Sequence, residues 1–155
     1  MSDESDLEYA GFWIRVGASL IDALLLLAIT IPLAWLLVGP SYWNDTSFFK
    51  GGFGFVLDYL MPFALTLAFW LSYQATPGKM AITAKIVDAR TGRAPSIVQY
   101  LVRYFGYILA ALPFFVGIIW VAFDRRKQGW HDKLAGTVVI RPKRNGAEKV
   151  VFSGR

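Results

Sequence analysis

The stretch GFWIRVGASLIDALLLLAITIPLAWLLV, residues 11–38, decides the fold of this 155-residue chain. It is long and apolar enough to cross a bilayer as one helix, which takes about 20 apolar residues. It nevertheless contains Arg15 and Asp22. Because a charge inside a membrane helix is costly, each of these residues needs a partner or a task. The stretch therefore predicts a membrane helix that carries a polar site.

The composition is that of an integral membrane protein. Hydrophobic residues make up 55% of the chain and charged residues 17%, and the mean hydropathy is +0.44. The absence of cysteine excludes a thiolate metal site, a disulfide framework and a cysteine nucleophile. A net charge of +5 would suggest nucleic acid in a soluble protein. Here the basic residues flank apolar segments and indicate membrane topology, so we expect no nucleic-acid partner.

Three apolar segments predict an all-α transmembrane fold. Residues 15–38 and 56–73 read as two full spans, and residues 104–123 form a third apolar helix that Pro113 breaks. The loop at residues 39–55 is weakly charged, which favours an extracytoplasmic position. We therefore expect a multi-pass protein.

The third segment has two readings, spanning or re-entrant, because both of its flanks are basic. If it spans once, the basic C-terminal segment lies outside and violates the positive-inside rule. If it bends at Pro113 and leaves on the side it entered, both flanks and both termini are cytoplasmic. A broken helix of this kind is tolerated where it is buried in protein or lines a cavity. We prefer the re-entrant reading.

The polar segments predict a small amount of further structure. Residues 76–78 (TPG) form a turn signal, and Ser96 suits the start of a helix. Residues 82–87 (ITAKIV) and 137–140 (TVVI) read as strands, which could pair as a short cytoplasmic two-stranded β structure. The domain boundaries are a polar N-terminal tail at 1–9, a membrane domain at 10–142 and a basic polar tail at 143–155.

A candidate polar network begins in the first span. Arg15 and Asp22 are seven residues apart and share a helix face. Arg15 lies near the entry point and can extend to the headgroups. Asp22 lies about 10 Å deeper, so we expect it to face the bundle interior and to be protonated or to hold a cation. The full set of candidate residues is Arg15, Asp22, Arg103, His131 and Asp132.

Two interpretations of this network compete. In the functional one, Asp22 exchanges a proton or a monovalent cation as its surroundings alternate, and His131 accepts a proton near neutral pH. In the structural one, the arginines pair with Asp22 or Asp132 and hold the helices in register. A second basic set could bind anionic lipid headgroups, although topology signalling explains it equally well. Its members are Arg125, Arg126, Lys127 and Lys133.

Patterns of catalysis and cofactor binding are missing. A single histidine cannot build a multi-histidine metal site. Gly78 and Lys79 lack the upstream glycine of a phosphate loop, and Met80 replaces its Ser or Thr. There is no nucleophile-elbow motif. We expect no enzyme activity, no catalytic residue, no metal and no cofactor.

Taken together, these motifs resemble the RDD family of small bacterial membrane proteins, which is named for one Arg and two Asp. Arg15 and Asp22 match the first two of these. The second Asp corresponds to Asp132 in WHDKLAGTVV, with Asp124 in FDRRKQG as the alternative. Further likeness covers residues 9–142 and includes TPGK at 76–79, IVDARTGRAP at 86–95 and Arg103.

The resemblance implies a bacterial inner-membrane protein and suggests transport, since some family members have been linked to sodium/proton antiport. The leading hypothesis is transport of a small solute, a monovalent cation or a proton. Three apolar segments offer little lining for a path, so transport implies a homo-oligomer. The alternative is a non-transporting structural or accessory subunit of a membrane complex.

Overall fold

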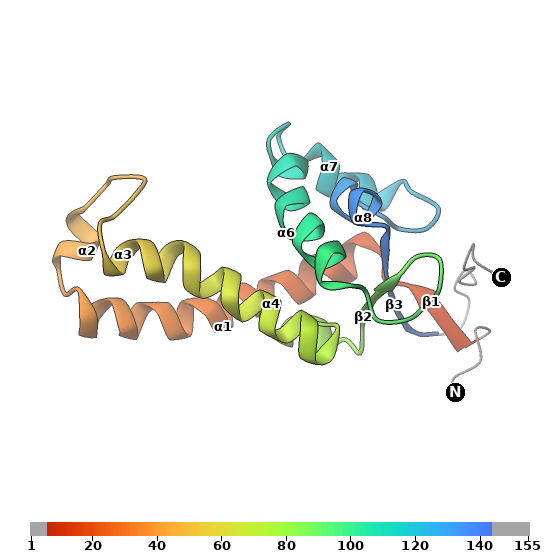
Figure 1. Cartoon of the computed structure of the whole chain (residues 1–155), viewed down its shortest axis with the longest axis horizontal. Coiled ribbons are helices and arrows are strands. Elements are labelled where there is room, and N and C mark those ends of the chain that lie inside the picture. Colours follow the sequence, from red (N-terminus) through yellow and green to blue (C-terminus); the bar gives the residue numbers. More distant parts are fainter. Residues whose placement is uncertain (1–5, 144–155) are drawn as a thin grey trace.

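The computed structural model describes residues 6–143 and is mostly helical, with one small sheet (Figure 1). The strands are β1 (Leu7–Tyr9), β2 (Lys85–Asp88) and β3 (Thr137–Pro142). The α-helices are α1 (Phe12–Leu37), α2 (Ser41–Asn44), α3 (Phe53–Phe55), α4 (Met61–Tyr73), α5 (Pro77–Ala81), α6 (Ile97–Ala111), α7 (Val116–Ile119) and α8 (Trp130–Ala135). A π-helical turn, Val56–Leu60, joins α3 to α4, and a 3-10 turn, Trp120–Ala122, follows α7.

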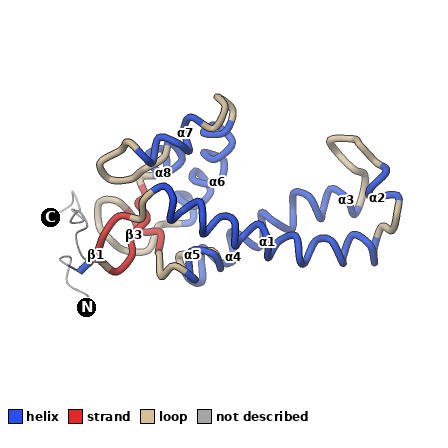
Figure 2. The backbone as a smooth tube through the Cα atoms, turned by 180° about the vertical axis from the view of Figure 1, so that it is seen from behind, coloured by secondary structure: helices blue, strands red, loops and turns tan. Residues whose placement is uncertain are grey.

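Two long apolar helices extend away from the rest of the molecule. The 26-residue helix α1 and the 21-residue segment Phe53–Tyr73 are both long and apolar enough to cross a membrane. Both views show them side by side (Figures 1 and 2). Only 6% of the most apolar window of α1 is buried. These two apolar helices match the predicted pair, and α1 has the surface of a helix that meets lipid or another protein.

The third apolar segment is bent, as the sequence predicted. Helix α6 and the Val116–Ala122 segment meet at 115°. Pro113 has no N–H to continue the helix, and Phe114 and Phe115 adopt positive φ angles of 50° and 61°. A Cβ at Gly117 would lie 2.7 Å from the Cα of Ala110, so glycine allows α7 to pack back against α6. The segment turns back on itself instead of continuing straight.

The sheet contains the predicted pair of strands and one more. Its order is β1–β3–β2, and both pairings are antiparallel. Strands β2 and β3 come from the two segments that the sequence predicted to pair, with Lys85 opposite Ile140 and Asp88 opposite Thr137. The fold is therefore helical with a three-stranded sheet, where two strands were expected.

The extra strand comes from the segment that the sequence analysis assigned to a polar tail. Leu7 and Tyr9 pack against the apolar cluster that contains Val138. Between them, Glu8 forms an ion pair with Arg141 of β3. Alternation of apolar and charged residues thus makes residues 7–9 a strand. Residues 1–5 and 144–155, most of the two predicted tails, lie outside the described residues.

Two local signals take defined forms. The TPG turn is the first turn of α5: Thr76 occupies the cap position with extended backbone, and Pro77 is the first helical residue, where the missing N–H of proline is harmless. Ser96 caps α6 as predicted, in a capping box with Gln99. Both signals fix where a short connection becomes helix.

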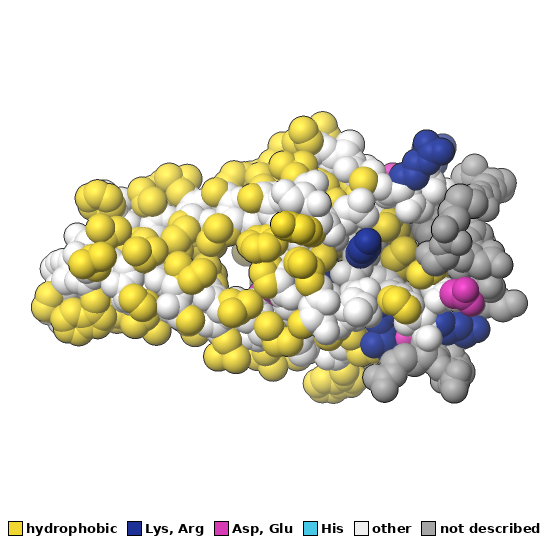
Figure 3. Space-filling model, turned by 90° about the horizontal axis from the view of Figure 1, so that it is seen from below, with side chains coloured by type: hydrophobic (Ala, Val, Ile, Leu, Met, Phe, Trp, Pro, Cys, Tyr) yellow, Lys and Arg dark blue, Asp and Glu magenta, His cyan; other side chains and the backbone are white. Residues whose placement is uncertain are grey.

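Charge is segregated along the molecule. Figure 3 shows apolar side chains over the long helices and Lys, Arg, Asp and Glu side chains gathered at the end that carries the sheet. At the junction where α4 meets α6 and the sheet, a buried core contains Trp70, Tyr100, Ile86 and Val139. The functional candidates lie at and near this junction.

Candidate functional site

The centre of the junction is an ion cluster around Asp132, whose own side chain is fully buried. Asp132 of α8 accepts hydrogen bonds from Arg15 Nη1 of α1 at 2.6 Å and from Arg103 Nη1 of α6. It also accepts the backbone N–H of Gly129 at 3.0 Å. The side chains of Asp132 and Arg103 are both 0% exposed. One carboxylate therefore joins three helices that are far apart in the sequence.

Further hydrogen bonds fix the two arginines. Arg15 donates from Nε to the carbonyl of Ala10 at 2.8 Å and from Nη2 to that of Lys127 at 2.5 Å. Arg103 donates to Thr137 Oγ1 at 2.8 Å. The expectation that Arg15 extends to the headgroups is wrong. Its side chain turns inward, because a buried carboxylate and two carbonyls take up the N–H groups of the guanidinium.

The charges of the cluster keep the Asp132 carboxyl group ionised. Burial acts to raise the pKa of Asp132, but the positive charges of Arg103 and Arg15 outweigh it and hold that pKa well below its usual range. Asp132 therefore stays ionised at physiological pH. Its geometry is that of a structural centre, since its oxygens already meet two cations and a backbone N–H.

His131 lies beside this cluster as a neutral ring. It is 2% exposed and stacks on Tyr107, with ring centroids 3.8 Å apart. Burial, the largest influence, lowers the pKa of His131 to about 3. Its Nε2 lies 3.4 Å from Asp132 Oδ2, but a neutral imidazole makes no ion pair there. A proton acceptor working near neutral pH does not fit these surroundings.

Asp22 lies outside the cluster and has its own surroundings. Its Oδ2 accepts the hydroxyl of Thr76 at 2.5 Å, and its Oδ1 accepts the backbone N–H of Gly78 at 2.6 Å. A Cβ at Gly78 would lie 1.9 Å from the carbonyl oxygen of Ala18. Only glycine lets the start of α5 approach α1 this closely. In the described part of the chain, Asp22 forms no ion pair.

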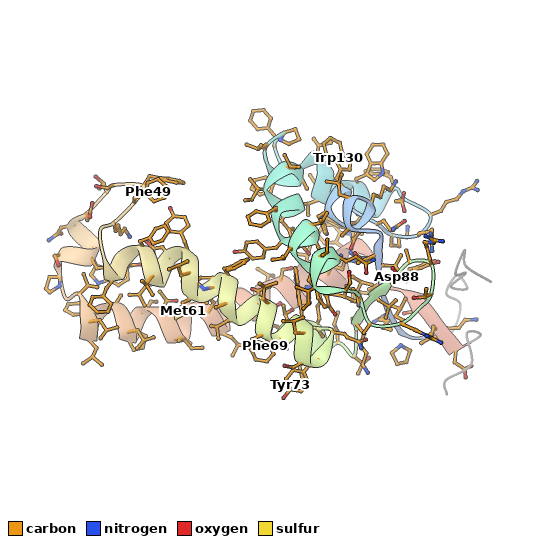
Figure 4. All side chains as sticks on the ribbon, viewed as in Figure 1. Phe49, Met61, Phe69, Tyr73, Asp88 and Trp130 are labelled. Atoms are coloured by element: carbon orange, nitrogen blue, oxygen red, sulfur yellow. The ribbon has the colours of Figure 1, made fainter. Side chains whose placement is uncertain are left out.

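A cavity opens beside Asp22 between α1 and α4. Its volume is about 180 Å³, and Leu26, Ile29, Leu65 and Phe69 contribute to its walls. Figure 3 shows a hollow in the apolar surface at this level, and Figure 4 labels Phe69 on α4. The carboxylate of Asp22 thus borders an apolar cavity, as expected for a residue that faces the interior.

Lys79, which is not among the site residues predicted from the sequence, also lies in this region. It is 6% exposed, and its Nζ lies 3.4 Å from Thr76 Oγ1. Burial lowers the pKa of Lys79, against the attraction of Tyr107 and Asp22. Lys79 therefore lies between the Asp22 site and the Asp132 cluster. Its position directly after Gly78, in the turn that docks on α1, was the signal that could have revealed it.

The predicted lipid-binding residues make several contacts within the protein. Arg126 donates to the carbonyl of Ala89 at 2.7 Å, Lys127 to that of Ala122 at 3.2 Å. Lys133 pairs with Asp124 at 2.5 Å, while Arg125 is exposed. An open surface pocket of about 690 Å³ contains Arg125, Arg126 and Lys133 together with Trp120 and Phe123. Basic groups and aromatic rings therefore meet at one surface.

Comparison with known proteins identifies the family. The model of the RDD family matches residues 9–136. The chain belongs to the RDD family. Arg15, Asp22, Asp124 and Asp132 all lie within the match, and of the last two it is Asp132 that meets Arg15. Asp124 instead stabilises a turn, because it accepts the backbone N–H of Arg126.

The relatives of this RDD protein described below are uncharacterized proteins, and one of them is named a membrane protein. It is 37% identical over 87 residues to the uncharacterized protein RP437 of Rickettsia prowazekii (strain Madrid E), covering 56% of this chain and 48% of that protein. It is 32% identical over 148 residues to the uncharacterized membrane protein YteJ of Bacillus subtilis (strain 168), covering 87% and 82%. It is 27% identical over 147 residues to YxaI of the same species, covering 84% and 96%. The chain thus spans about half the length of RP437 and most of the two Bacillus proteins. No solved structure matches it.

The geometry separates two acidic centres of the RDD fold. Asp132 is buried, ionised and surrounded by cations. Asp22 is partly exposed and next to a cavity, and within residues 6–143 its hydrogen-bond donors are neutral groups. Of the two, Asp22 has room for a ligand.

Proposed function

We propose that this RDD protein transports a small solute or monovalent cation across the bilayer, with Asp22 exchanging a proton for the transported charge. The observation that supports this most is the place of Asp22, on a cavity between two apolar helices and without an ion-pair partner among residues 6–143. The proposal involves no catalytic step.

The chemistry follows from the cost of charge in an apolar region. A carboxylate at membrane depth is neutralised by a proton or by a cation. Its two oxygens offer about four acceptor positions, and the hydrogen bonds from Thr76 and Gly78 use two. Asp22 also lines the cavity, which leaves the remaining positions for a ligand. A group that alternates between a proton and a cation couples the movement of one to that of the other.

We propose a bacterial inner membrane as the location, with α1 and Phe53–Tyr73 crossing it. The charged end with the sheet faces the cytoplasm, in agreement with the positive-inside rule. The bent α6–α7 segment then enters and leaves from that side. Arg125, Arg126, Lys127 and Lys133 meet anionic headgroups there. Two spans and one bent segment enclose little space, so the working unit is an oligomer.

Single-cysteine labelling tests this topology, since the chain has no native cysteine. Ser47→Cys marks the loop before α3, and Thr91→Cys and Arg125→Cys mark the two flanks of the bent segment. A membrane-impermeant maleimide added to intact cells should label Ser47→Cys alone. Labelling of Arg125→Cys together with Ser47→Cys would show instead that the third segment crosses the membrane.

Ion flux in proteoliposomes tests the function. A dye for the internal pH reports proton movement when Na⁺, K⁺, Li⁺ or a small organic cation is added outside. We expect a cation-dependent signal from the wild type and none from Asp22→Asn. Asp45→Asn, in the exposed loop, is the matched control and should behave as the wild type. A full signal from Asp22→Asn contradicts the proposed exchange.

The exposed surface of α1 supports a second candidate, an accessory subunit. Apolar residues such as Leu20, Leu24 and Leu36 are 61%, 67% and 80% exposed, and another membrane protein would cover them as well as lipid does. In that case Asp22→Asn changes the recovery of the partner complex and not flux. Co-purification of the wild type and of Asp22→Asn in mild detergent separates the two candidates.

A further inference from the structure

We propose that the cavity beside Asp22 binds a compact hydrophobic primary ammonium, a molecule with one ring-sized apolar body and one protonated amine. This inference names the substrate class for the transport proposed above and rests on that function. It follows from the size of the cavity, the chemistry of its walls and the single carboxylate at its edge.

The size fits one ring. The cavity measures about 180 Å³, and a dry apolar cavity of about 150 Å³ is enough to hold benzene in other proteins. Leu26 and Ile29 of α1 face Leu65 and Phe69 of α4 across it. Walls of this kind gain dispersion contacts with an apolar body and offer nothing to a hydrated ion. The space therefore suits an apolar group with little room beyond a ring and a short arm.

The charge fits one amine. Asp22 lines the same cavity, and the two groups that donate hydrogen bonds to it, the Thr76 hydroxyl and the Gly78 N–H, are neutral. An ammonium brings several N–H donors, and its attraction to a carboxylate strengthens as water is excluded. A neutral ligand would bring no charge to Asp22, which a proton would then have to neutralise. A small inorganic cation would leave the apolar walls without contacts.

Lys79 does not take the place of this ligand. Its Nζ lies 3.4 Å from Thr76 Oγ1, the hydroxyl that donates to Asp22 Oδ2, so Thr76 links Lys79 to Asp22, and the two form no direct ion pair among the described residues. The charged and titratable groups that act on Lys79 from the elements packed around it are Asp22 and Arg15 of α1, Arg103 and Tyr107 of α6 and His131 of α8. Asp22 lines the cavity and has acceptor capacity beyond Thr76 and Gly78, which we assign to a ligand amine.

The ligand has a route from the membrane. The hollow between the two long helices is visible from outside the molecule (Figure 3), and the surrounding surface is apolar. An amphiphilic amine collects at the bilayer interface, with its ring among the acyl chains and its charge at the headgroups. It therefore arrives beside the opening already oriented.

Equilibrium dialysis of the full-length protein in lipid nanodiscs tests this site. Benzylamine is the cationic probe and benzyl alcohol its neutral counterpart of nearly equal size, with empty nanodiscs as the partition blank. We expect Asp22→Asn to weaken benzylamine binding about tenfold or more and to leave benzyl alcohol within about twofold. Leu65→Phe fills the cavity and should weaken both probes. Leu71→Phe on the exposed face of α4 is its matched control and should change neither.

Several results would overturn the assignment. Equal binding of benzylamine to the wild type and to Asp22→Asn would show that Asp22 does not recognise the ammonium group of the ligand. If Leu65→Phe does not accumulate, Ile29→Phe is used in its place to fill the cavity. Benzylamine binding that persists in the variant with the filled cavity would show that the probe binds elsewhere and that the hollow holds lipid chains.

The same measurements separate this inference from the proposed transport. Cation flux that depends on Asp22, without benzylamine binding, overturns the substrate class and leaves transport. Benzylamine binding that depends on Asp22, without flux, overturns transport and leaves the site.

Discussion

Replacing Asp132 with asparagine removes one negative charge from the most buried part of the protein. Arg103, whose side chain is 0% exposed, and Arg15, 10% exposed, then lose their shared counter-ion. Asparagine keeps the shape and one acceptor oxygen, so packing changes little. Leaving a buried charge unpaired costs about 3–5 kcal/mol. We expect Asp132→Asn to lower the free energy of unfolding by that amount.

Thermal unfolding of the purified protein in detergent, followed by tryptophan fluorescence, measures this loss. A loss of that size lowers the melting temperature by on the order of 10 °C in a chain of this length. The control is Lys133→Met, which breaks the pair with Asp124 on the same helix. Because the side chain of Lys133 is 44% exposed, that pair contributes about 1 kcal/mol or less.

A second variant checks the cause of the loss. Adding Arg15→Met to Asp132→Asn leaves one unpaired buried cation instead of two, so the double variant should regain part of the stability. The reasoning is refuted if Asp132→Asn melts no lower than Lys133→Met. It is also refuted if the double variant loses the sum of the two single losses, because the residues would then not be coupled.

Two further predictions concern the groups around this cluster. Gly78→Ala should lower the free energy of unfolding by about 3 kcal/mol, because its Cβ would meet the backbone oxygen of Ala18 at 1.9 Å; Gly17→Ala, which meets nothing within 4 Å, should cost nothing in the same melting assay. His131 has a pKa of about 3 in the folded protein against 6.5 for the free group. Between these two values the unfolded chain binds a proton that the folded chain does not, so the protein becomes less stable as the pH is lowered. From pH 7 to pH 5 the loss attributable to this group is about 2 kcal/mol, and His131→Phe, which keeps the stack on Tyr107, should flatten that slope; an unchanged slope would show that the ring is not the titrating group.

The sequence predicted those parts of the fold that depend on local pattern. Long apolar runs specify membrane helices wherever they occur, and Pro113 breaks a helix through its own ring and missing N–H. The strands around Lys85 and Thr137 also paired as predicted. The third strand was missed because residues 7–9 are a short alternating run beside an acidic end, and its partner lies more than 100 residues away.

The sequence predicted several residues of the candidate site but not which of them contact one another. Arg15 and Asp22 share a helix face, but helical spacing says nothing about which other segment docks at each position. Asp132 reaches Arg15 from α8, whereas Thr76 and Gly78 of the α5 turn reach Asp22. Residues predicted as one network therefore occupy two places. Depth of burial, which makes His131 a neutral ring and hides Lys79, depends on packing between distant segments and leaves no mark in the local sequence.

Flux and stability measured together on Asp22→Asn test the central claim most directly. Asparagine keeps an acceptor for the α5 turn, so its cost to stability should be about 1 kcal/mol. The account predicts that cation-driven proton movement disappears while the melting temperature stays close to that of the wild type. Undiminished flux from the folded variant, or flux lost only in proportion to unfolded protein, would contradict a role for Asp22 as the exchanging carboxylate.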